Sequence, residues 1–148
     1  MKDKVFIDTN IFVYSALDDE EEKVKREKAI ELLKKFSGQQ TIVSTQILNE
    51  FYSVLLKHNI PDKSIQDKLN TIINDSIVAL IRVETIKNSW KLRARYNISF
   101  WDSLIVASAL ENGCIILYTE DLHHSQLIEG RLRILNPFIQ LPTDSTFK

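Results

Sequence analysis

The feature that most constrains the fold is the alternation of short, β-branched apolar runs with longer segments of helical periodicity. We predict strands at residues 4–7, 41–43, 77–83, 114–118 and 132–135. We predict helices at residues 18–35, 44–57, 61–73, 85–96 and 99–112, and a turn at residues 8–10. The run 77–83 is continuous enough for a strand covered on both faces. Strands that alternate with helices predict an α/β domain with a mainly parallel central sheet flanked by helices.

The chain of 148 residues suits one domain with a single core. We expect residues 1–141 to form this domain and the aperiodic residues 142–148 to form a short tail. No segment approaches the roughly 20 apolar residues of a membrane span, and no apolar stretch of a secretory signal follows the N-terminal charges. The single cysteine, Cys114, cannot form an internal disulfide. We therefore expect a soluble, cytoplasmic protein.

Four carboxylates lie next to apolar runs, where soluble chains seldom have them. Asp8 ends the first strand, Glu50 lies within the second helix, Asp102 begins the last helix, and Asp121 follows the fourth strand. Burying a carboxylate without a partner costs more free energy than one side chain usually recovers. Four such residues in one cleft would need a counter-charge, and a divalent cation is the natural one.

The predicted architecture brings these carboxylates to one edge of the sheet. Ligands of open α/β sheets bind outside the carboxyl ends of the strands. Asp8 and Asp121 follow strands directly, and Glu50 and Asp102 lie early in helices that begin near the same edge. Four separate pieces of chain can thus present oxygen atoms to one place.

Each residue also has a structural alternative. Asp102 lies three positions after Ser99, so the two can form a capping box. Asp8 can simply open a turn, and Asp121 can cap a following helical turn. Glu50 lies on or beside an apolar helix face, where exposure at the edge of that face is the alternative. The functional interpretation therefore depends on the four residues together.

An oxygen-only set of ligands determines which metal is expected. No His or Cys lies beside Asp8, Glu50 or Asp102, so a zinc site is not indicated. Carboxylates are hard ligands that suit Mg²⁺ or Mn²⁺. Such a cation lowers the pKa of a bound water and neutralises charge on phosphate oxygens, which is the chemistry of phosphodiester hydrolysis. The net charge of −1 means that any RNA contact must come from a local patch or from metal.

The motifs that contain these acids resemble the PIN-domain signature, and most closely that of VapC-type ribonuclease toxins of toxin–antitoxin systems. The resemblance spans about residues 5 to 138 and rests on four motifs in order, which lie at residues 6–10, around Glu50, at 100–109 and at 117–122. It implies a single PIN-like domain and a Mg²⁺- or Mn²⁺-dependent endoribonuclease that cleaves RNA. It also implies a homodimer inhibited by a small antitoxin protein, which often places an Arg or Lys near the acids.

The resemblance assigns a role to each acid. Asp8 and Asp102 would be the principal metal ligands, Asp121 would complete the metal shell, and Glu50 would orient a water or act as a base. Glu120 adjoins Asp121, and spacing alone does not choose between them. The polar neighbours of these acids are expected to support them by hydrogen bonds; they are Thr9, Asn10 and Thr119.

Further residues have weaker claims to a function. Basic side chains on one helix and before the last strand can hold RNA phosphates or form an ordinary solvated face; they include Arg93, Arg95 and Arg131. Trp90 and Trp101 can stack on bases, but their helical spacing favours core packing. His123 and His124 are read as an ordinary loop pair, with RNA or metal contact as the alternative, and Cys114 is expected only to pack.

Two other classes of function remain open from the sequence. An Asp after the first strand also suits a metal-dependent phosphotransfer domain, although the second position after Asp8 is Asn10 rather than a second acid. A non-catalytic α/β binding module would keep the acids only as caps. Replacement of Asp8 by Asn would leave the effects of such a module unchanged.

Overall fold

The computed structural model describes residues 3–36 and 40–139. The predicted domain boundary at residue 141 and the predicted tail at 142–148 lie outside these residues. Within the described part of the chain, none of the helices has the length and apolar character needed to cross a membrane.

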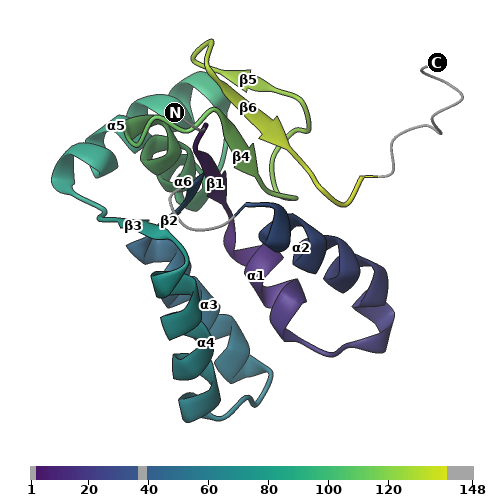
Figure 1. The fold of residues 1–148 in the computed structure, drawn as a ribbon. Helices are drawn as coiled ribbons and strands as arrows, with labels where there is room; N and C mark the ends of the chain where they lie inside the picture. Colours follow the sequence, from purple (N-terminus) through teal and green to yellow (C-terminus); the bar gives the residue numbers. More distant parts are fainter. Residues whose placement is uncertain (1–2, 37–39, 140–148) are drawn as a thin grey trace, which may run out of the picture.

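A mostly parallel sheet forms the centre of the fold, as predicted (Figure 1). Its strands, in chain order, are β1 (Val5–Ile7), β2 (Thr41–Ser44), β3 (Ile77–Ala79), β4 (Ile116–Tyr118), β5 (Leu127–Ile128) and β6 (Leu132–Leu135). They lie in the order β3-β2-β1-β4-β6-β5, and only the β5–β6 pair is antiparallel. The central strands β1 and β4 are adjacent and parallel, so their carboxyl ends meet at one edge.

Helices connect the strands and pack as neighbouring pairs. They are α1 (Thr9–Ala16), the 3-10 helix η1 (Glu20–Glu22), α2 (Lys23–Lys35), α3 (Thr45–Lys57), α4 (Asp62–Asn74), α5 (Val83–Tyr96) and α6 (Phe100–Glu111). Figure 1 shows the α1–α2 and α3–α4 pairs projecting beyond the same end of the sheet, while α5 and α6 lie alongside it. The apolar helix α6 is buried over residues 103–110, so it is the most enclosed of these helices.

The segment after β1 is a helix, where we predicted only a turn. The Asp8 side chain caps α1 by accepting the backbone N–H of Thr9 at 2.7 Å. The turn-like Asp-Thr-Asn sequence is therefore a helix start. Ile11, Phe12 and Val13 are all buried, and this continuous apolar run conceals the helical period.

The prediction of a doubly covered strand at 77–83 is wrong. β3 ends at Ala79 and lies at the edge of the sheet. Leu80 and Val83 are each 67% exposed, and Val83 already belongs to α5. The two-residue strand β5 was not predicted, because two residues carry no periodicity.

The core consists of the strands and the helix faces turned toward them. Phe6, Ile7 and Leu117 are completely buried, and Cys114 packs in the core as expected. The expectation of core packing for the tryptophans is wrong, because Trp90 is 57% and Trp101 is 62% exposed.

Candidate metal and RNA site

The pairing of β1 with β4 determines where the first two acids lie. Ile7 pairs with Tyr118, and the backbone N–H of Asp8 donates to the carbonyl oxygen of Tyr118 at 3.0 Å. Asp8 therefore follows the end of β1 immediately beside the end of β4. Asp121 lies three residues beyond Tyr118, in the loop that leaves the same edge.

Asp8 is buried, with 4% of its surface exposed, and each of its carboxylate oxygens accepts a hydrogen bond. Oδ1 accepts the N–H of Thr9 at 2.7 Å, and Oδ2 accepts the hydroxyl of Thr119 at 2.7 Å. Burial raises the pKa of Asp8 to about 7, against the two hydrogen bonds that favour the charged form. The charges of Asp121 and Glu50 raise this pKa further, which shows that the three acids are within electrostatic reach of one another.

Thr9 connects two of the acids. Its backbone N–H binds Asp8, and its hydroxyl donates to Glu50 Oε1 at 3.0 Å. Glu50 itself is half-buried at the second turn of α3. Glu50 therefore lies at the same edge of the sheet as Asp8, and Thr9 supports both side chains.

Asp102 lies in the first turn of α6, half-buried. The capping alternative is realised in part, because the Ser99 hydroxyl accepts the backbone N–H of Asp102 at 3.1 Å. Burial raises the pKa of Asp102, and hydrogen bonding with Ser99 opposes this rise. The charge of Asp102 in turn raises the pKa of Asp121, after burial as the larger cause. Asp102 therefore lies within electrostatic reach of Asp121, in addition to its place in the first turn of a helix.

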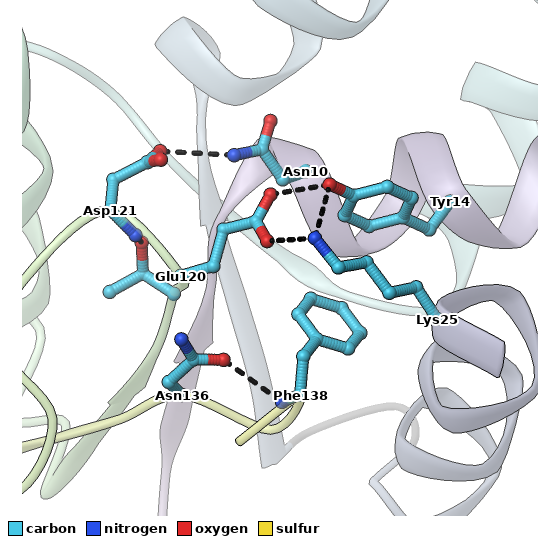
Figure 2. A network of polar contacts seen from close by, with 8 residues as sticks. Asn10, Tyr14, Lys25, Glu120, Asp121, Asn136 and Phe138 are labelled. Atoms are coloured by element: carbon cyan, nitrogen blue, oxygen red, sulfur yellow. Dashed lines mark hydrogen bonds and ion pairs between the residues drawn. The ribbon is translucent and has the colours of Figure 1, made fainter. Parts of the chain in front are cut away.

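The two adjacent acids Glu120 and Asp121 point in different directions (Figure 2). Asp121 Oδ2 accepts the side-chain amide of Asn10 at 3.0 Å, and its backbone N–H donates to the hydroxyl of Thr119 at 3.1 Å. These contacts keep Asp121 with the residues around Asp8. The arrangement favours Asp121 over Glu120 as the fourth acid.

Glu120 instead belongs to a separate polar network (Figure 2). Its Oε1 accepts the hydroxyl of Tyr14 at 2.6 Å, and its Oε2 forms an ion pair with Lys25 Nζ at 2.9 Å. Lys25 Nζ also lies 5.0 Å from the ring centroid of Tyr14 and 5.6 Å from that of Phe138. The charge of Glu120 is thus balanced by Lys25. The hydrogen bonds that Lys25 forms with Glu120 and Tyr14 raise the pKa of Lys25. Sequence reasoning missed Tyr14 and Lys25, since neither lies in an acid-containing motif.

The donor set fits a hard cation. Among the described residues, no three Asp, Glu, His or Cys side chains come close enough to form a ready-made metal cage. Mg²⁺ does not require such a cage, because it usually binds one or two carboxylates and keeps several waters. All four acids supply oxygen. Beyond the effect of burial, the charge of Asp121 raises the pKa of Asp8 and the charge of Asp102 raises that of Asp121, and a cation would relieve this repulsion.

The candidate basic residues lie away from this edge. Arg131 lies just before β6. Because β6 runs parallel to β4, the start of β6 lies at the edge of the sheet opposite to the acids. The guanidinium of Arg95 forms an ion pair with Glu129 at 2.6 Å, on the same side as Arg131. Arg93 is exposed on α5. The structure therefore does not place these residues with the acids.

The two adjacent histidines have different surroundings. His123 is exposed in the loop after Asp121. His124 Nδ1 accepts the backbone N–H of Asn136 at 2.9 Å, which is a structural contact between two loops. The interpretation of an ordinary loop pair fits this arrangement for His124.

Comparison with known proteins identifies the fold. The model of the PIN domain family matches residues 5–129. No match was found among curated proteins. A toxin–antitoxin complex from Klebsiella pneumoniae is similar, with 20% identity, a TM-score of 0.68 and coverage of 91% of this chain and 98% of that one.

Two further solved structures share the fold. VapC20 of Mycobacterium tuberculosis, described as a sarcin-ricin loop cleaving toxin, has 15% identity and a TM-score of 0.63, over 77% of this chain and 87% of that one. VapBC2 of Rickettsia felis, bound to a DNA fragment from its promoter, has 19% identity and a TM-score of 0.60, over 89% of this chain and 98% of that one. At these identities the likeness concerns the fold.

Proposed function

We propose, since this chain belongs to the PIN-domain family, that it is a metal-dependent endoribonuclease and the toxin of a toxin–antitoxin pair. The observation that supports this most is the group of acids at the carboxyl ends of β1 and β4. Asp8 is buried there with a raised pKa and is electrostatically coupled to Glu50 and Asp121. Perturbed carboxylates at the ligand-binding edge of an α/β sheet favour a catalytic site over helix caps.

Each residue has a defined part in this proposal. When bound, Mg²⁺ or Mn²⁺ would supply charge neutralisation at the phosphate and a water of lowered pKa. Asp8, Asp102 and Asp121 would hold the cation, while Thr9, Asn10 and Thr119 keep the acids in place through the hydrogen bonds described above. Glu50, held by Thr9, is the candidate for orienting the attacking water or accepting its proton.

The proposed partners are RNA, a second copy of the chain and a small antitoxin. The Klebsiella pneumoniae and Rickettsia felis structures are toxin–antitoxin complexes, which supports the presence of an antitoxin for this chain. An Arg or Lys of the antitoxin, placed among the acids, would compete with the cation for the same negative charge. This gives a physical reason for inhibition.

The test is cleavage of total cellular RNA by the purified protein with Mg²⁺, with Mn²⁺ and with EDTA. We expect discrete fragments that require metal. Asp8→Asn and Asp102→Asn should each reduce cleavage by about 100-fold or more while the fold survives, because catalysis needs the carboxylate charge and the fold does not. Circular dichroism provides the control for folding.

Three results would contradict the proposal. Full cleavage by Asp8→Asn would exclude the assigned site. Absence of cleavage by wild-type protein shown by mass spectrometry to be free of any inhibitor would favour the binding module. Tight binding of beryllofluoride at Asp8 would favour the phosphotransfer alternative.

A further inference from the structure

A groove of about 500 Å³ adjoins the acids between α3 and α6. Glu50, one of the four acids, is part of its lining, and so is Trp101, which directly precedes Asp102. Leu104 and Ile81 add apolar surface. The groove is therefore continuous with the acid site, and a ligand bound at the acids can extend into it.

Trp101 is one of the exposed large apolar residues of this chain, and it lies in the groove. It lies in the first turn of the most enclosed helix, yet its side chain is 62% exposed, and its ring makes a T-shaped contact with the Phe100 ring at 5.1 Å between centroids. An exposed indole gains little from packing in the folded chain. It does offer a flat aromatic face on which a nucleic-acid base can stack.

The polar groups of the groove are neutral. Gln46, Asn49 and Ser53 line it at successive turns of α3, and none of its described lining residues is Lys or Arg. Beside Glu50, a site without cations disfavours a phosphate. Amides and hydroxyls are instead the groups that bind the edges of bases.

Gln46 provides a separate indication that the groove takes a ligand. It is 9% exposed, and its amide nitrogen donates to the Trp101 carbonyl oxygen at 3.2 Å. Its amide oxygen is buried and has no hydrogen-bond partner among the described residues. Such an acceptor is costly unless a donor reaches it. An N–H group at the edge of a base has the required chemistry.

We infer that this groove is a subsite for one unpaired base of the RNA, with Trp101 as its stacking surface and Gln46 as a contact to the base edge. The inference rests on the proposed function, because the continuity of the groove with Glu50 is what identifies the occupant as substrate. The base of a nucleotide beside the cleaved bond would enter the groove while its phosphate lies at the acids. The subsite would therefore contribute to the choice of cut site.

Two tryptophans of similar exposure allow a matched test by kinetics. With an RNA oligomer that contains a cut site, Trp101→Ala should raise KM by about 10-fold, within the range that one base–aromatic stack supports. Trp90→Ala, on α5 outside the groove, should leave KM and kcat unchanged. Trp101→Phe keeps a smaller aromatic face and should give an intermediate KM. Gln46→Met should reduce the discrimination among bases at the cut site.

A second measurement reads binding directly, without cleavage. In EDTA, the fluorescence of Trp90→Phe protein, in which Trp101 is the remaining tryptophan, should be quenched saturably by the oligomer. Trp101→Phe protein should show no such quenching. An oligomer with an abasic nucleotide beside the cut site should lose the effect, because its phosphates and sugars remain but the base is gone.

The outcomes separate this inference from the proposed function. If the protein cleaves RNA with metal but Trp101→Ala behaves as Trp90→Ala, the subsite is wrong and the nuclease stands. Equal quenching by the abasic oligomer would also overturn it. So would a change in oligomeric state of Trp101→Ala by light scattering with unchanged KM, because Trp101 would then cover a second copy of the chain. If the wild type cleaves no RNA, the proposed function itself fails.

Discussion

At the scale of single residues, Asp8 illustrates how burial outweighs local hydrogen bonding. Two donors at 2.7 Å stabilise its charged form, yet its pKa rises from 3.8 to about 7. Desolvation is the largest cause, and the neighbouring acids add to it. The residue that caps α1 is therefore also the one that most needs a positive partner.

This pKa predicts a pH dependence of stability. A carboxyl group with a higher pKa in the folded chain stabilises the fold fully below its unfolded pKa, near 4, and loses this contribution as pH rises through about 7. In EDTA, the stability of Asp8→Asn relative to wild type should therefore increase from pH 5 to pH 8, on the order of 3 kcal/mol. Urea denaturation at several pH values measures this, and parallel curves for the two proteins would contradict it.

A second prediction at this scale concerns Glu120 and Asp121. Asp121 faces Asn10 and the other acids, whereas Glu120 is neutralised by Lys25. Asp121→Asn should weaken Mn²⁺ binding by about tenfold or more, and Glu120→Gln should weaken it less. Titration calorimetry with Mn²⁺ compares the two. An equal or larger loss in Glu120→Gln would assign the fourth acid to Glu120.

At the scale of elements, a network connects the first helices to the loop after β4. Tyr14 on α1 and Lys25 on α2 both bind Glu120, and the Tyr14 ring meets the Phe138 ring edge-on at 5.1 Å. The loop that carries Asp121 is thereby held against α1 and α2. One polar network thus joins two neighbouring helices to a loop about 100 residues away in sequence.

This network predicts a local contribution to stability. Lys25→Met and Tyr14→Phe should each lower the free energy of unfolding by about 1 kcal/mol, because Lys25 is partly exposed and solvent weakens its ion pair. The double variant should lose less than the sum, since both residues bind the same carboxylate. Lys63→Met, which breaks an exposed pair with Asp67 within α4, is the control and should change little. Additive losses in thermal denaturation would contradict the coupling.

At the scale of the whole molecule, the sheet order brings the acids together. β1 and β4 are adjacent, although more than 100 residues separate them in sequence, and α3 and α6 begin near the same edge. In the absence of a cation, this convergence concentrates negative charge and raises the pKa of several acids. The molecule should therefore be stabilised when a cation is bound.

Metal binding should raise the unfolding temperature. At a Mn²⁺ concentration 100 times its Kd, mass action adds about 2.7 kcal/mol, which corresponds to roughly 8 °C for a chain of this size. Asp8→Asn should show almost none of this rise. Thermal denaturation at pH 8 with Mn²⁺ and with EDTA measures it, and an equal rise in both proteins would mean that the cation binds elsewhere.

Some features of this protein were determined by local sequence alone. The alternation of strands and helices predicted the parallel sheet, and the four motifs predicted which acids lie at its edge. Asn97 and Gly113 end α5 and α6 with positive φ angles of 55° and 71°, as their residue types allow. These features depend on short-range periodicity and backbone sterics, which a single sequence expresses directly.

Other features were decided only by tertiary structure. Position at the edge of the sheet shortened β3 and exposed Leu80, although the run from 77 to 83 has the composition of a buried strand. Contacts across about 100 residues paired Glu120 with Lys25 and directed Asp121 to Asn10. The packing of the chain also left Trp101 exposed beside Glu50. Which face of an element meets a neighbour depends on how the whole chain packs. For this reason the sequence predicted which acids gather at the edge of the sheet, and packing decided which partner each acid contacts.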